Sequence, residues 1–148
     1  MRVALDTNVL VAAFATRGLC SDLFRLLLAE HDLIVTDVLL EELGRVLTAK
    51  LGLPNDRRDG LLAFLTSFHS IETQTADSKL LKFGLRDRDD ERVLASVIDS
   101  GAEVLVSGDK DLLEAVLPEA LPLRVVSPRG FWELLRGQPA SPDEVHEP

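Results

Sequence analysis

The 148-residue chain is 46% hydrophobic and 28% charged, which is typical of one soluble globular domain with its own core. Cys20 is the only cysteine, so an intrachain disulfide framework and a cysteine-based zinc site are excluded, and a reducing cytoplasm is the expected location. The net charge of −9 is unlike the basic balance of most nucleic-acid-binding proteins. No stretch approaches the roughly 18 apolar residues of a membrane span, and Asp6 and Asn8 interrupt the only segment that resembles a signal peptide.

The first half of the chain alternates short apolar runs with amphipathic segments. Residues 2–5 and 33–36 are continuous apolar runs and predict buried strands. Apolar residues recur at helical spacing between and after these strands. The predicted helices span about 22–30, 38–49 and 55–68, with Ser21, Asp37 and Asn55 at their starts.

The second half repeats this alternation after an irregular polar stretch over residues 74–86, which follows a possible strand at 71–73. A helix is predicted to start at Asp89 or Asp90 and to end before Gly101. The remaining predicted elements are a strand at 104–106, a short helix through Val116, a strand at 124–126 and a helix from Pro128. We expect one domain over residues 1–136 and a disordered acidic tail over 137–148.

Apolar strands that alternate with amphipathic helices predict an α/β fold with a mostly parallel central sheet. In such sheets, sites form beyond the carboxyl ends of the strands. Asp6 ends the first strand, and Asp109 in "SGDKD" follows the strand at 104–106. Both carboxylates are therefore expected at the same edge of the sheet.

Two further acids are predicted to point inward from helices. Glu42 lies at or beside the apolar face of the helix over 38–49, and Asp90 shares the face of Val93 and Leu94. Carboxylates without histidine or cysteine suit Mg²⁺ or Mn²⁺. Each acid also has a structural interpretation: Asp90 and Asp109 as helix or turn caps, and Glu42 as a border residue. From the pattern alone, both interpretations stay open.

Three segments resemble the motifs of the PIN domain family, whose fold is shared by VapC-type toxins of prokaryotic toxin–antitoxin pairs. "VALDTNVLVAA" is similar to the opening strand of the family, "VTDVLLEELGRVL" to its second acidic motif, and "RDRDDERVLASVIDSGAEVLVSGDKDLL" to its long third block. "RVVSPRGFWELL" resembles the closing strand and helix. The resemblance covers about residues 1–135 and implies a three-layer, Rossmann-like fold.

The resemblance also implies roles for individual residues. Asp6, Glu42, Asp90 and Asp109 match the family's catalytic acids, with Asp6, Asp90 and Asp109 as ligands of Mg²⁺ or Mn²⁺. Asn8 and Ser107 match positions that support the site, and Asp87 and Asp111 have at most a supporting role. Arg88 replaces a usual proline and Ser107 a usual threonine.

The implied function is metal-dependent hydrolysis of RNA by a homodimeric toxin that a small antitoxin protein silences. The candidate RNA contacts are Arg17, Arg45, Arg86, Arg88 and Lys110, although the simpler interpretation of each, a solvated surface charge, is favoured. The alternative is a non-catalytic module of the same fold that binds RNA or protein. A haloacid-dehalogenase-like phosphatase is disfavoured because Asn8 stands where its second aspartate is needed, and "VLVSGDKD" gives only a weak likeness to a receiver domain.

Overall fold

The computed structural model describes residues 1–67, 70–71 and 84–137. Five parallel strands form the central sheet in the order β3-β2-β1-β4-β5. Their bounds are Arg2–Leu5 (β1), Asp32–Thr36 (β2), Ser70–Ile71 (β3), Val104–Val106 (β4) and Arg124–Val126 (β5). The α/β fold with a parallel sheet is thus confirmed, and among the described residues no helix combines the length and hydropathy needed to cross a bilayer.

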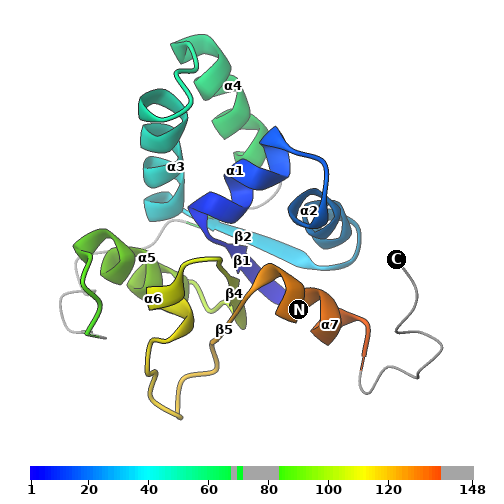
Figure 1. Ribbon diagram of the computed structural model, residues 1–148, viewed down its shortest axis with the longest axis vertical. Helices are drawn as coiled ribbons and strands as arrows, with labels where there is room; N and C mark the ends of the chain where they lie inside the picture. The colour runs from blue at the N-terminus through cyan, green and yellow to red at the C-terminus, as the bar shows by residue number, and fades with distance from the viewer. Residues whose placement is uncertain (68–69, 72–83, 138–148) are drawn as a thin grey trace.

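Helices cover both faces of this sheet. In Figure 1, α1 to α4 lie above the strands, α5 and α6 lie to their left, and α7 lies to their right. Helix α3 packs against α1, α4 and α5, and α7 packs against α2. The helix bounds are Thr7–Ala15 (α1), Leu19–Glu30 (α2), Asp37–Ala49 (α3), Asn55–Thr66 (α4), Arg88–Asp99 (α5), Lys110–Leu113 (α6) and Pro128–Leu135 (α7).

The order of the strands places β1 beside β4 at the centre of the sheet. Successive crossovers move outward from β1 to β2 and β3, and the chain then returns to the other side of β1. Leu5 pairs with Val106 in the register of β1 and β4, and both are buried at the carboxyl ends of their strands. This reversal of strand order is where open parallel sheets commonly bind ligands.

The core explains why the apolar strands and helix faces of the sequence fold together. Strands β1, β2 and β4 contribute continuous buried runs, and the helices add one apolar face each. Phe131 of α7 is fully buried, as are Leu23 of α2 and Leu43 of α3. At about 25 cal/mol per Å² of buried apolar surface, this core is the main stabilising contribution.

Several predicted helix starts were wrong by one or more residues. Helix α2 begins after Gly18 rather than at Ser21, and the Thr36 hydroxyl, not Asp37, caps α3 by accepting a hydrogen bond from the Leu39 N–H. Asp87, not Asp89 or Asp90, caps α5. For α3 and α5, a polar residue slightly upstream reaches the free N–H groups first, whereas Gly18 precedes α2 without a side-chain cap.

Two helices differ in extent from the prediction. Helix α1 was not predicted, because the polar Thr7 and Asn8 obscure the helical spacing of the apolar residues after Asp6. Helix α6 ends at Leu113, and Val116 beyond it is 85% exposed. The predicted irregular stretch over 74–86 and the tail over 137–148 lie almost entirely outside the described residues.

Candidate metal centre

The carboxyl ends of β1 and β4 are tied together by polar side chains. The Asp6 backbone N–H donates to the Val106 carbonyl at 2.8 Å. The Ser107 hydroxyl donates to Asp6 Oδ2 at 2.8 Å and accepts from the Asp109 backbone N–H at 3.0 Å. Asp6 Oδ1 accepts from the Thr7 backbone N–H at 2.9 Å, so both oxygens of this buried carboxylate are fixed. Ser107 therefore links the two strand-end aspartates directly.

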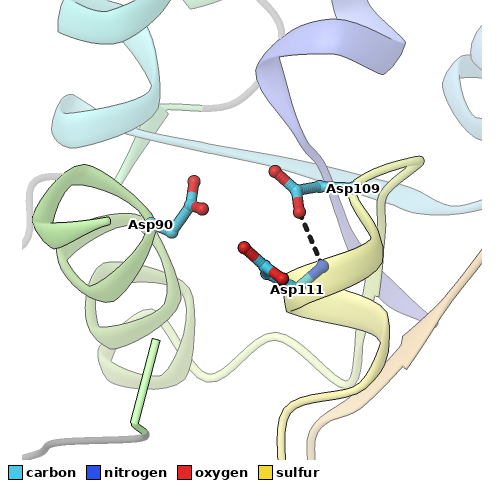
Figure 2. A group of neighbouring side chains, drawn as sticks. All are labelled: Asp90, Asp109 and Asp111. Atoms are coloured by element: carbon cyan, nitrogen blue, oxygen red, sulfur yellow. Dashed lines mark hydrogen bonds between the residues drawn. The ribbon is translucent and has the colours of Figure 1, made fainter. Parts of the chain in front are cut away.

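Asp109 combines a structural contact with a position in an acidic cluster. It is the N-cap of α6, where its Oδ1 accepts from the Asp111 backbone N–H at 2.8 Å. Carboxylate oxygens of Asp90, Asp109 and Asp111 also lie within 4.8 Å of one another. Figure 2 shows Asp90 reaching from α5 toward the two aspartates at the start of α6. The cap and site interpretations of Asp109 are thus compatible.

Asp90 is available to this cluster because another residue caps its helix. The Asp87 side chain accepts from the Asp89 backbone N–H at 2.8 Å. Asp90 is then the third residue of the helix, half-buried, with its carboxylate turned toward Asp109. The predicted supporting residue Asp87 thus acts as the cap of α5, and the cap interpretation of Asp90 was wrong.

Burial and neighbouring charges make the charged form of Asp90 unfavourable. Its removal from water, followed by the negative charges of Asp109, Asp87, Asp6 and Glu42, raises the pKa of Asp90 to about 7. Burial also raises the pKa of Asp6, and Asp109 adds to this effect, whereas the hydrogen bonds from Ser107 and Thr7 oppose it. The acids predicted from the sequence therefore interact electrostatically at one edge of the sheet.

Glu42 approaches the cluster from α3. Burial is the main cause of its raised pKa, and the charges of Asp6 and Asp89 raise it further. The neighbouring Thr7 hydroxyl and the Arg45 guanidinium lower it. The buried Thr7 hydroxyl has no hydrogen bond of regular geometry within the described chain, so its interaction with Glu42 is one of proximity rather than a directed bond.

This donor set fits a divalent cation that prefers oxygen ligands. The cluster offers carboxylate oxygens from three aspartates within coordination reach of one another, and Asp6 adds its charge from the adjacent strand end. Burial, followed by the charges of neighbouring acids, raises the pKa of Asp90, and burial with a contribution from Asp109 raises that of Asp6, so a cation would stabilise their charged forms. Hard oxygen ligands of this kind suit Mg²⁺ or Mn²⁺.

The candidate RNA contacts lie in different surroundings. Arg45 is paired with Glu41 at 2.9 Å and lies 3.9 Å from Asp89. Arg86, Arg88 and Lys110 are exposed. Arg86 and Arg88 flank Asp87 in the chain, and Lys110 directly follows Asp109. Exposed cations beside a negative site are suitable for an anionic polymer.

Two other candidates have no hydrogen bond to the acids within the described residues. Asn8 is exposed in the first turn of α1, and within the described chain no hydrogen bond connects it to the acids. Arg17 follows the far end of α1 and lines a hollow of about 750 Å³ with Ser21, Asp22 and Arg25. Its place at the end of a nine-residue helix separates it from Asp6 by about 13 Å of helix length.

Sequence reasoning gave too little weight to two residues. Asp111 was assigned at most a supporting role, yet its carboxylate lies in the cluster with Asp90 and Asp109. Local spacing gave no signal for this, because the position of Asp111 depends on how α6 turns after its N-cap Asp109. Thr7 was not singled out, although its position directly after Asp6 places it at the same strand end.

The fold and the acidic cluster define an α/β domain with a carboxylate site at the switch point of a parallel sheet. A family model described as "PIN domain" matches residues 2–111. The chain belongs to the PIN domain family.

Among solved structures, a chain in the crystal structure of VapBC2 from Rickettsia felis, bound to a DNA fragment from their promoter, has a similar fold. The TM-score is 0.62 with 16% sequence identity, over 86% of this chain and 98% of that chain. No curated protein matches the sequence.

Proposed function

We propose that this protein is a metal-dependent endoribonuclease and the toxin of a toxin–antitoxin pair. The observation that supports this most directly is the convergence of Asp90, Asp109 and Asp111 beside Asp6 in a chain of the PIN domain family. Asp6, Asp90 and Asp109 would hold Mg²⁺ or Mn²⁺, and Asp111 is a further candidate ligand. When bound, the cation supplies an activated water and stabilises negative charge on the phosphoryl oxygens.

The residues around the cluster have distinct roles in this proposal. Ser107 fixes the orientation of Asp6 and Asp109. The Glu42 carboxylate accepts a hydrogen bond from the attacking water and orients it toward phosphorus, which suits an acid whose burial favours taking up a proton. Lys110, Arg86 and Arg88 attract the RNA backbone to this negative edge.

We further propose a cytoplasmic homodimer with a small antitoxin as partner. The solved structure of similar fold is a VapBC2 complex, which supports a partner protein of this kind. An arginine of the partner would suit the acidic cluster, because its planar guanidinium pairs bidentately with carboxylates. Inhibitor and cation would then compete for the same oxygens.

The test is cleavage of a labelled structured RNA by the purified protein with Mn²⁺, with Mg²⁺ and with a chelator. Asp109→Asn is the matched inactive variant, because asparagine retains the cap of α6 while removing the charge. We expect cleavage only with metal and only by the wild type. RNA binding without cleavage under every condition would instead support the alternative, a non-catalytic binding module.

A further inference from the structure

Beside the acidic cluster, four charged side chains form a chain of ion pairs between α3 and α5. Arg45 Nη1 lies 2.9 Å from Glu41 Oε1, and its Nη2 lies 3.9 Å from Asp89 Oδ2. The other oxygen of Glu41, Oε2, lies 3.8 Å from Arg92 Nη2. The order Asp89–Arg45–Glu41–Arg92 alternates in charge and crosses between the two helices twice. We call these four residues the α3–α5 ion-pair network.

Two members of the network are the sequence neighbours of Glu42 and Asp90, the two site acids that lie on helices. Glu41 directly precedes Glu42 on α3, and Asp89 directly precedes Asp90 on α5. Because consecutive helical residues point about 100° apart, the acids face the cluster while their neighbours face outward. In addition to burial, the charge of Glu42 contributes to the raised pKa of Asp90, and the charge of Asp89 raises the pKa of Glu42, so the acids of α3 and α5 repel one another.

We infer that the α3–α5 ion-pair network is a positioning device, which holds the helices bearing Glu42 and Asp90 together against carboxylate repulsion and so keeps the candidate metal centre assembled. This inference rests on the proposed metal site. Both arginines are engaged by protein carboxylates, so their primary role is between helices rather than with RNA. Their side chains are about half exposed, and a single exposed pair contributes little, but the network gives each of its two central charges, Arg45 and Glu41, two partners.

The test removes each cross-helix pair without changing the net charge. Arg45→Gln combined with Asp89→Asn deletes one cross-helix pair, and Glu41→Gln combined with Arg92→Gln deletes the other. Each double substitution also removes the Arg45–Glu41 pair within α3, so the control must remove a pair within one helix. Both charges of a pair are removed together, because loss of an arginine alone would also increase the attraction of the site for a cation. The control is Asp22→Asn combined with Arg25→Gln, an exposed pair at 3.1 Å within α2, whose acid also lies in the first turn of its helix.

Isothermal titration calorimetry with Mn²⁺ gives the first readout. We expect the affinity for Mn²⁺ to fall about three- to tenfold in both cross-helix deletions and to stay unchanged in the control. Equal affinities in all variants would overturn the positioning role.

Thermal melting of the metal-free protein gives a second readout that does not depend on metal binding. At mildly alkaline pH, each cross-helix deletion should lower Tm by about 1–4 °C, and by clearly less when Asp90→Asn has already reduced the repulsion. The same drop in both backgrounds would show ordinary surface pairs and refute the inference. A wild type that binds no Mn²⁺ but shows this coupling would refute the proposed metal site and leave the network's role intact.

Discussion

The acidic site has a strand-borne half and a helix-borne half, and the two are held in different ways. Asp6 and Asp109 follow β1 and β4, and hydrogen bonds hold both in place. The Asp6 carboxylate accepts from the Thr7 N–H and the Ser107 hydroxyl. The Asp109 N–H donates to the Ser107 hydroxyl, and the Asp109 carboxylate accepts from the Asp111 N–H. Within the described chain, Asp90 of α5 makes no hydrogen bond through its carboxylate, and Glu42 of α3 has only the nearby Thr7 hydroxyl.

Hydrogen bonds of the fold therefore organise only part of the site. The strand-borne half is fixed by the register of the sheet, because Leu5 and Val106 are paired neighbours. In the helix-borne half, burial and then the charges of neighbouring acids raise the pKa of Asp90 to about 7, and we infer that ion pairs between α3 and α5 hold this half together. Variants of the two halves should therefore fail in different ways.

The largest effect is expected on catalysis from Asp6→Asn. The substitution keeps an acceptor for the Thr7 N–H but removes a charge from the proposed metal ligands. We expect RNA cleavage with Mn²⁺ to fall at least about a hundredfold, with no loss of thermal stability, because one source of repulsion is also removed. Cleavage at the wild-type rate by a folded variant would refute the role of Asp6.

The next largest effect is expected on stability from Ser107→Ala. Ser107 is fully buried, and without its hydroxyl Asp6 Oδ2 and the Asp109 N–H both lose their partner. We expect the free energy of unfolding in urea to fall by about 1–3 kcal/mol.

Ser100→Ala is the matched control for this experiment, because the buried Ser100 hydroxyl donates only to the Val97 carbonyl of its own helix. A loss of stability no greater than that of the control would show that Ser107 does not organise the strand-borne half.

A smaller effect, and one confined to the helix-borne half, is expected in the pH dependence of stability. The pKa of Asp90 is raised from 3.8 to about 7, so the folded protein binds a proton more tightly than the unfolded chain. This contribution to stability is fully present below about pH 4 and is lost as the pH rises toward 7. Metal-free protein should therefore lose stability across this window.

Asp90→Asn should reduce that loss by roughly 2–4 °C in Tm between pH 5 and pH 8, as measured by thermal melting in the presence of a chelator. Asp99→Asn serves as the control, because it removes an exposed carboxylate at the other end of α5 that is not among the charges acting on Asp90. A Tm profile of Asp90→Asn that is parallel to the wild type would contradict the raised pKa.

The sequence was sufficient for the parts of this arrangement that depend on local pattern. The strands at 2–5 and 104–106 were confirmed, because short apolar runs are buried at the centre of the sheet. The strand at 124–126 was also confirmed, although Arg124 is exposed and its two valines are only partly buried. The helix starts were less predictable, since several polar residues compete for the same N–H groups and tertiary contacts decide among them. Thr36, for example, is held at its cap position partly by a hydrogen bond to Ser96 of α5 at 2.9 Å.

The candidate site was predictable in the same partial way. The strand ends indicated Asp6 and Asp109, and helical periodicity indicated Asp90 and Glu42, whereas their roles as metal ligands stay predictions. The place of Asp111 depends on how α6 turns after Asp109, and the ion pairs between α3 and α5 depend on how those helices pack. Neither property is encoded in local spacing.

The smallest effect is expected at Thr7, where the two halves meet. Its hydroxyl is buried without a regular hydrogen bond, yet it favours the charged form of Glu42. Thr7→Val keeps the shape and removes an unsatisfied polar group, so we expect the metal-free protein to gain about 0.5–1 kcal/mol in urea unfolding. Mn²⁺ affinity should fall two- to threefold, or about 0.5 kcal/mol, because Glu42 then holds its proton more tightly. Thr7→Ser retains the hydroxyl and should leave the affinity unchanged. If Thr7→Val instead costs more than about 1 kcal/mol of stability, the hydroxyl makes a directed hydrogen bond, and Glu42 belongs with the hydrogen-bonded half of the site.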